Sequence, residues 1–217
     1  MERPHLNMGA GAGFKIDIML LCDSTGSMYS AIGDVKADFI DAYKKLLAAT
    51  QWDAQVGVAY YKDTTDADPY RVLASITDDD AGLQQAVNSL VPSGGGDQPE
   101  GQLFALTELS NRASSGWRPG AMRIICWFGD EYGHDPITEE GVTCTLESTA
   151  NALIDKNVYV CAFSMAPTND LNGGALNQAV QITNLTNGVS TGQYFKPNVA
   201  QAGVTEFIFS FIQNHLP

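Results

Sequence analysis

Two hydrophobic patterns alternate along the chain: short, almost continuous apolar runs, and longer stretches whose apolar residues recur at helical spacing. The apolar runs are typical of strands buried on both faces. Strands are therefore predicted at residues 14–22, 53–61, 70–76, 123–128 and 158–164, with a short edge strand at 193–195. Helices are predicted at 28–49, 80–91, 99–112, 139–156, 175–185 and 199–213.

Alternation of strands with helices predicts the α/β class, with a doubly wound, mostly parallel sheet covered by helices on both faces. The strand at 70–76 follows its predecessor so closely that we expect it to run antiparallel to it. Ligands of such folds bind at the carboxyl ends of the strands. The loops after residues 22, 91 and 128 are therefore the places to look for chemistry.

Composition narrows the function classes. The chain has 217 residues, of which 12 are basic and 25 acidic, giving a net charge of −13. A hydrophobic share of 44% excludes intrinsic disorder. The acidic balance argues against nucleic acid and against an anionic membrane surface as partners. Residues 1–13 are expected to form a flexible leader, and residues 14–217 a single domain.

The lack of a recognisable targeting signal and the pattern of the cysteines favour a cytoplasmic protein. No apolar run is long enough to span a membrane, and the first residues lack the apolar core of a signal peptide. The four cysteines form no Cys-x-x-Cys pair, and three of them lie within apolar, strand-like runs. We therefore expect buried, reduced thiols.

The first of the three loops contains Asp23, Thr25 and Ser27. Alternate residues of a turn can direct their oxygens to one point, and carboxylate and hydroxyl oxygens suit Mg²⁺ or Mn²⁺ better than Zn²⁺. The alternative interpretation is that these residues only cap the following helix.

The second loop contains three consecutive glycines, followed by Asp97 and Glu100. Glycines allow unusual backbone angles and a close approach of the chain to a ligand. Taken alone, however, Asp97 with Glu100 three residues later is typical of a helix-capping box, with Pro99 in the first turn.

The third loop begins with Asp130 at the end of an apolar strand, where a carboxylate has little structural purpose. Glu131 is expected to be a solvated neighbour, and His134 a hydrogen-bonding residue. Asp135 is expected to cap the helix that follows.

Taken together, Asp-x-Thr-x-Ser at 23–27, Gly-Gly-Asp at 95–97 and Gly-Asp at 129–130 closely resemble the von Willebrand factor A family. The metal-ion-dependent adhesion site of that family is built from Asp-x-Ser-x-Ser, a Thr in the second loop and an Asp in the third. The resemblance extends from Phe14 to the last helix. Intracellular and bacterial members look most similar, because they share Tyr-x-Asp (61–63) and Gly-Asp-x-x-x-His-Asp-Pro (129–136).

The resemblance implies a Mg²⁺ or Mn²⁺ site that binds an acidic side chain of a protein partner, without catalysis. Its implied ligands are Asp23, Thr25, Ser27, Asp97 and Asp130, and its implied partner-contacting rim is Asp63, Glu131, Tyr132 and His134. Asp97 replaces the usual Thr. This additional carboxylate should hold the metal more firmly and make it less attractive to a partner carboxylate.

Two other functions stay open. The first is a degenerate scaffold domain whose site is not used, since folds outlast functions. The second is a phosphatase similar to the haloacid dehalogenases, suggested by the late Gly-Asp motif. Such enzymes need an Asp two residues after the nucleophile, where this chain has Thr25, and a Lys between the motifs. No Lys occurs between residues 94 and 128.

Overall fold

The computed structural model describes residues 13–49, 51–165, 171, 173, 177–187 and 202–215. Five strands form one sheet, in the order β3-β2-β1-β4-β7. Their bounds are β1 Phe14–Asp23, β2 Trp52–Tyr61, β3 Tyr70–Thr77, β4 Met122–Gly129 and β7 Val158–Ser164. The α-helices are α1 Ile32–Ala48, α2 Asp80–Ser89, α3 Gln102–Asn111, α4 Leu146–Asp155, α5 Gln178–Asn187 and α6 Ala202–His215.

The sheet has the predicted mostly parallel topology. β1 pairs in parallel with β2 and β4, and β4 with β7, whereas β3 runs antiparallel to β2 at the edge. The α/β class and the antiparallel edge strand are thus confirmed. β1 lies at the centre, where the order reverses, and the loops after β1 and β4 open side by side at the carboxyl edge.

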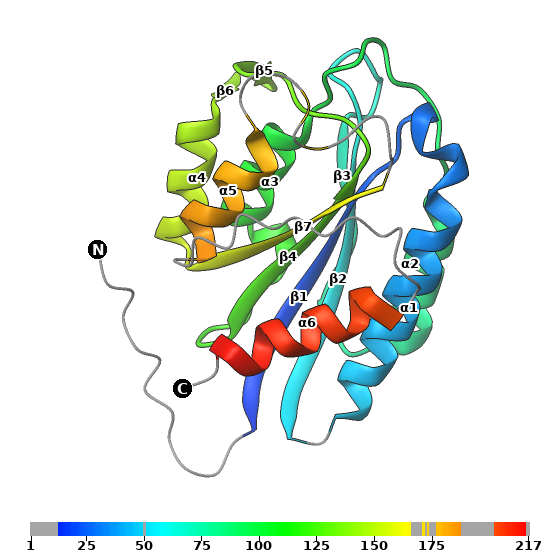
Figure 1. The fold of residues 1–217 in the computed structure, drawn as a ribbon, viewed down its shortest axis with the longest axis vertical. Helices are drawn as coiled ribbons and strands as arrows, with labels where there is room; N and C mark the ends of the chain where they lie inside the picture. Colours follow the sequence, from blue (N-terminus) through cyan, green and yellow to red (C-terminus); the bar gives the residue numbers. More distant parts are fainter. Residues whose placement is uncertain are drawn as a thin grey trace.

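Helices cover both faces of the sheet: α1, α2 and α6 lie on one side, and α3, α4 and α5 on the other (Figure 1). The side chains of β1 show why both faces of the sheet must be buried. Its residues Ile16, Ile18, Leu20 and Cys22 pack under α1 and α6, while Met19 and Leu21 pack under α3. This alternation has the period of two that a strand imposes. Both sides are therefore apolar cores, and polar chemistry is left to the strand ends.

The predicted helix 139–156 is wrong in its first part. A small hairpin precedes the helix, formed by β5 Ile137–Glu139 and β6 Val142–Cys144. Glu140 and Gly141, which join the two strands, both have positive φ, as the favoured two-residue hairpin turn requires. α4 then begins at Leu146, behind a capping box between Thr145 and Ser148.

Other helix boundaries also differ from the prediction. The segment expected to start a helix at Met28 is a 3-10 helix, η1 Gly26–Ser30, before α1 begins at Ile32. α3 begins at Gln102 rather than Pro99, and no side chain caps it. The capping box predicted for Asp97 and Glu100 is therefore wrong, which leaves both carboxylates available for other contacts. The expected strand 193–195 lies outside the described residues.

Among the described residues, no helix is both long enough and apolar enough to cross a membrane.

Candidate metal centre

Backbone hydrogen bonds join the first two predicted loops. The amide of Gly26 donates to the carbonyl of Gly94 at 3.0 Å, and the amide of Ser93 donates to the carbonyl of Ser24 at 3.0 Å. Gly94 and Gly95 both have positive φ, and a Cβ at Gly95 would press against the Thr25 side chain at 3.2 Å. Glycine is therefore required for this close approach.

Four of the five predicted ligands form one chain of hydrogen bonds. Thr25 donates its amide and its hydroxyl to Oδ1 of Asp23, at 2.8 and 2.7 Å. The hydroxyls of Thr25 and Ser27 lie 3.0 Å apart, and Ser27 donates to Oδ1 of Asp130 at 3.0 Å. The structure thus brings Asp23, Thr25, Ser27 and Asp130 together.

The two acids of this chain are buried. Asp23 is fully buried and Asp130 is 4% exposed. Burial raises the pKa of Asp23 to about 7, with Asp130 adding to the rise and the Thr25 donors opposing it. Burial also raises the pKa of Asp130. Oδ2 of Asp23 has no hydrogen-bond partner among the described residues. Such a buried oxygen is costly unless something neutralises it.

Glu100 is a further buried acid near Asp23 and Thr25, one for which the sequence predicted only helix capping. It is 3% exposed, and its Oε2 has no hydrogen-bond partner in the described part of the chain. Burial raises its pKa to about 9, reinforced by the charges of Asp23, Asp63 and Asp130. The sequence contained a signal, the Asp-x-x-Glu spacing of the Gly-rich loop, but it favoured helix capping.

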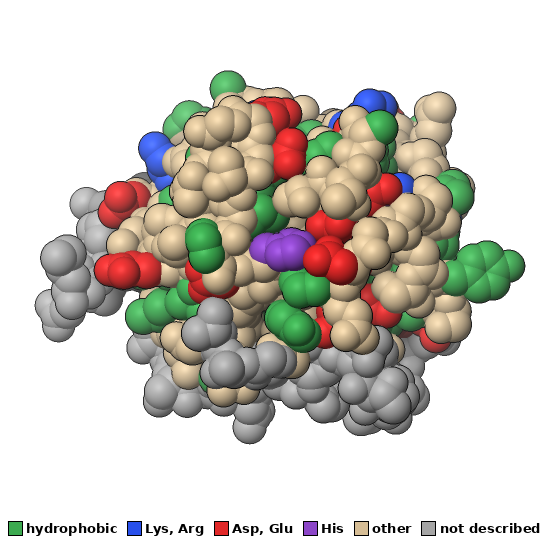
Figure 2. All heavy atoms as spheres, turned by 90° about the horizontal axis from the view of Figure 1, so that it is seen from above, with side chains coloured by type: hydrophobic (Ala, Val, Ile, Leu, Met, Phe, Trp, Pro, Cys, Tyr) green, Lys and Arg blue, Asp and Glu red, His purple; other side chains and the backbone are tan. Residues whose placement is uncertain are grey.

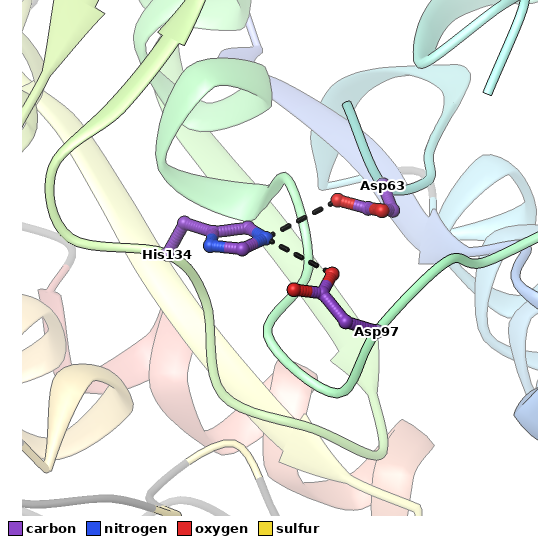
Figure 3. Close-up of side chains that lie close together, drawn as sticks. All are labelled: Asp63, Asp97 and His134. Atoms are coloured by element: carbon purple, nitrogen blue, oxygen red, sulfur yellow. Dashed lines mark hydrogen bonds and ion pairs between the residues drawn. The ribbon is translucent and has the colours of Figure 1, made fainter. Parts of the chain in front are cut away.

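Asp97, the fifth predicted ligand, belongs to a different cluster. Its Oδ1 lies 3.4 Å from Nε2 of His134, which also lies 3.3 Å from Oδ1 of Asp63 (Figure 3). Potential ligand atoms of these three residues all lie within 4.8 Å of one another. The carboxyl edge therefore carries two neighbouring groups of polar side chains, where the sequence predicted one.

The predicted rim residues differ in exposure. Asp63 is fully buried and Glu131 is 7% exposed, whereas Tyr132 is half-buried and the His134 side chain is 28% exposed. Glu131 accepts from the amide of Tyr132 at 3.2 Å instead of standing in solvent. Asp135 accepts from the amide of Leu146 at 3.3 Å, so it helps to cap α4 from across the hairpin. Tyr132 and His134 are the rim residues with surface to offer a partner.

Unbalanced negative charge is the main electrostatic feature of this edge. On the face that Figure 2 looks down on, acidic side chains lie against one side of a histidine. Among the described residues, no Lys or Arg forms an ion pair with Asp23, Asp63, Asp97, Glu100 or Asp130. The nearby Lys62 instead donates to the carbonyl and hydroxyl of Ser93. Buried carboxylates without a basic partner are the ordinary surroundings of a bound cation.

Solved structures similar to this chain show the same fold. They include a pilus adhesin, SpaC from Lactobacillus rhamnosus GG in an open conformation (14% identity, TM-score 0.61, 93% of this chain and 30% of that chain). The vWF domain of the type V pili tip protein Mfa5 from Porphyromonas gingivalis matches at 12% identity and a TM-score of 0.65, over 95% of this chain and 98% of that chain. Proximal thread matrix protein 1 from the mussel byssus matches at 14% identity and 0.60, over 92% and 48%. These likenesses show the fold alone.

Sequence comparisons complete the picture. No curated protein matches this chain. The model of the von Willebrand factor type A domain matches residues 17–202, which is most of the chain and includes all three site loops. The chain therefore belongs to the von Willebrand factor type A domain family.

Proposed function

We propose that this domain is a protein-interaction module that holds one Mg²⁺ or Mn²⁺ ion at Asp23, Thr25, Ser27, Glu100 and Asp130. The observation that carries the proposal is the hydrogen-bonded chain from Asp23 to Asp130, with an unpartnered buried oxygen beside it. Relative to the sequence prediction, Glu100 takes the place of Asp97, because Asp97 lies beside His134.

The donor set fits a hard cation. Every side chain in it offers oxygen, which is the ligand type that Mg²⁺ and Mn²⁺ prefer. Oδ2 of Asp23 and Oε2 of Glu100 are buried and unpartnered, so a cation would satisfy both. Neutralisation of these charges by a cation would also relieve the repulsion that raises the pKa of Glu100.

The partner would supply an acidic side chain. A Mg²⁺ ion retains several water molecules, and exchange of one for a partner carboxylate would join the two proteins. Tyr29, on η1 two residues after Ser27, has 82% of its surface exposed. Exposed aromatic residues beside a polar anchor are frequent centres of interface energy, so Tyr29 joins Tyr132 and His134 as a proposed contact.

Catalysis is not part of the proposal. A phosphatase of the haloacid dehalogenase type would need an acid at position 25, whereas Thr25 is committed to Asp23 by two hydrogen bonds. The scaffold alternative needs no metal at all, and the experiment below separates it from the proposal. The cytoplasmic location expected from the sequence stays a prediction, since the solved structures include pilus proteins and show the fold alone.

The test is thermal unfolding in EDTA and then in excess Mg²⁺ or Mn²⁺. A ligand at about 100 times its dissociation constant adds about 2.7 kcal/mol to the free energy of unfolding. We expect a rise in Tm with either metal in the wild type and none in Asp23→Ala. Asp97→Asn is the matched control and should keep the rise, because Asp97 lies outside the proposed ligand set. No rise in any metal would favour the scaffold alternative.

Partner binding needs a second readout. A displayed peptide library should yield peptides that bind in Mg²⁺ and dissociate in EDTA. Replacement of their acidic residue by the corresponding amide should abolish that binding. Peptides that bind equally well in EDTA, or equally well as amides, would contradict recognition through the metal.

A further inference from the structure

Asp63, Asp97 and His134 come from three different loops of the carboxyl edge. Asp63 follows β2, Asp97 ends the Gly-rich loop, and His134 follows β4 (Figure 3). Nε2 of His134 lies 3.3 Å from Oδ1 of Asp63 and 3.4 Å from Oδ1 of Asp97. One imidazole nitrogen therefore faces two carboxylates that are distant in sequence.

The two separations from Nε2 of His134 are compatible with a metal site of tetrahedral type, and all three ligand atoms lie within 4.8 Å of one another. Zinc-bound histidine nitrogen and carboxylate oxygen lie at about 2.0–2.2 Å from the ion, and tetrahedral angles then place neighbouring ligand atoms about 3.3–3.5 Å apart. The histidine also changes the preferred metal. Imidazole suits zinc and related transition metals, whereas an all-oxygen set suits Mg²⁺.

The cluster is held in place by contacts of its own. Both oxygens of Asp63 are oriented, Oδ1 by the amide of Thr64 and Oδ2 by the hydroxyl of Thr65, each at 2.7 Å. A Cβ at Gly96 would collide with Asp63 and Thr65, so glycine lets the loop pass. Orientation of ligands by surrounding hydrogen bonds is usual in metal sites.

His134 is positioned from its backbone. Its amide donates to the carbonyl of Glu100 at 3.1 Å, and the amide of Glu100 donates to the carbonyl of Tyr132 at 3.0 Å. The side chain of Gln178 on α5, which is 1% exposed, binds the backbone of the adjacent Gly133 twice. Its Oε1 accepts from the Gly133 amide at 2.8 Å, and its Nε2 donates to the Gly133 carbonyl at 2.7 Å. The backbone that carries the imidazole is therefore held in place by hydrogen bonds.

The total charge of this edge also bears on a second cation. The charges of Asp23 and Asp63 both act on the buried Glu100, whose Oε2 has no partner among the described residues. With Asp23, Asp63, Asp97 and Asp130 it makes five carboxylates, none paired with Lys or Arg in the described part of the chain. With all five carboxyls ionised, one divalent cation leaves three negative charges uncompensated, and a second cation leaves one.

We infer that Asp63, Asp97 and His134 form a second cation site, separate from the first, that takes a divalent transition metal ion of the zinc class. Three protein ligands leave the fourth tetrahedral position to water or to a partner group. The inference is independent of the proposed function, since neither site uses the ligands of the other.

Cobalt(II) is the probe, because tetrahedral cobalt absorbs strongly in the visible range and octahedral cobalt weakly. The 217-residue chain is titrated with Co²⁺ in saturating Mg²⁺, and Zn²⁺ is then added to displace the Co²⁺. We expect strong visible absorption that saturates at one Co²⁺ per chain and disappears on addition of Zn²⁺. His134→Asn and Asp97→Asn should lower the Co²⁺ affinity at least about tenfold, since loss of supporting groups alone costs that much.

Two variants separate the sites. Asp23→Asn should keep the strong absorption and lose the Mg²⁺-dependent rise in Tm. His134→Asn should lose the strong absorption and keep the Mg²⁺-dependent rise in Tm. Weak absorption in the wild type, or strong absorption retained in His134→Asn, would overturn the second site. Loss of both responses in each variant would also overturn it, since that result would mean a single shared site.

Discussion

Two buried aspartates of β1 differ in their partners: one is paired with an arginine, and the other has only neutral donors around it. Asp17 and Asp23 are both fully buried and lie on the same face of the strand, near its amino and its carboxyl end. Asp17 accepts from the amide of Arg118 and from its Nε, each at 2.6 Å. Asp23 accepts from the amide and the hydroxyl of Thr25, and the Tyr61 hydroxyl, another neutral donor, also acts on it.

Burial alone therefore does not mark a functional acid. It raises the pKa of both carboxyls, and at Asp17 the Arg118 guanidinium opposes the rise. Arg118 also contacts Asp53 and the carbonyls of Ile16 and Asp53, so the lower end of the sheet is a closed network. The upper end has neutral donors and a surplus of carboxylates. What distinguishes the candidate metal site is therefore a buried acid that has no Lys or Arg beside it among the described residues.

The largest effect is expected where the closed network is broken. Arg118→Met leaves Asp17 buried without its cation, and removal of one partner of a buried ion pair typically costs about 3–5 kcal/mol. We expect a loss of this size in the free energy of unfolding, measured by urea titration in EDTA. The Mg²⁺-dependent gain should persist in the folded protein, since Arg118 lies at the opposite edge of the sheet.

Asp53→Asn is the control for that experiment. The Asp53 side chain is 45% exposed, so its ion pair with Arg118 should contribute no more than about 1 kcal/mol. A cost equal to that of Arg118→Met would mean that the exposed pair, and not the burial of Asp17, determines stability at this end.

The next largest effect is expected for Asp23→Asn, whose effect on the free energy of unfolding should have opposite signs in EDTA and in Mg²⁺. Asp23→Asn keeps the shape and the contact with Thr25 but removes the charge, so we expect the variant to be more stable than the wild type in EDTA. In saturating Mg²⁺ it should be less stable, because it loses a gain of about 2.7 kcal/mol. Urea titrations under both conditions measure this. The same sign in both conditions would contradict a metal ligand at Asp23.

The smallest effect, per unit of pH, is a pH dependence of the metal-free protein. The pKa of Asp23 is about 7 in the folded state, above its ordinary value of 3.8, so the folded state binds the proton more tightly. Its contribution to stability is then retained below about pH 4 and lost as the pH rises to about 7. In EDTA, the difference in the free energy of unfolding between wild type and Asp23→Asn, measured by urea titration, should grow over this window by at most about 1.4 kcal/mol per pH unit. A difference that stays constant from pH 4 to 7 would show that Asp23 does not titrate there.

The sequence by itself determined the scaffold and four of the five residues proposed for the first metal site. The apolar run of β1 needs cover on both faces, which fixes its central place in the sheet. The Asp-x-Thr-x-Ser spacing is local, so the turn that follows β1 brings Asp23, Thr25 and Ser27 together without help from distant residues. Asp130 could be added because carboxyl ends of parallel strands share one edge.

Only the tertiary structure decided which acid of the Gly-rich loop lies near Asp23 and Thr25. Asp97 and Glu100 are three residues apart and both suited a helix cap, yet α3 begins at Gln102. Backbone bonds from Glu100 to Tyr132 and His134 bury the Glu100 side chain, while Asp97 stays at the surface beside His134. Contacts between loops that are more than thirty residues apart made this choice. Local spacing records the preference of a segment for a turn or a helix, but it carries no information on the partner that competes for the same backbone groups.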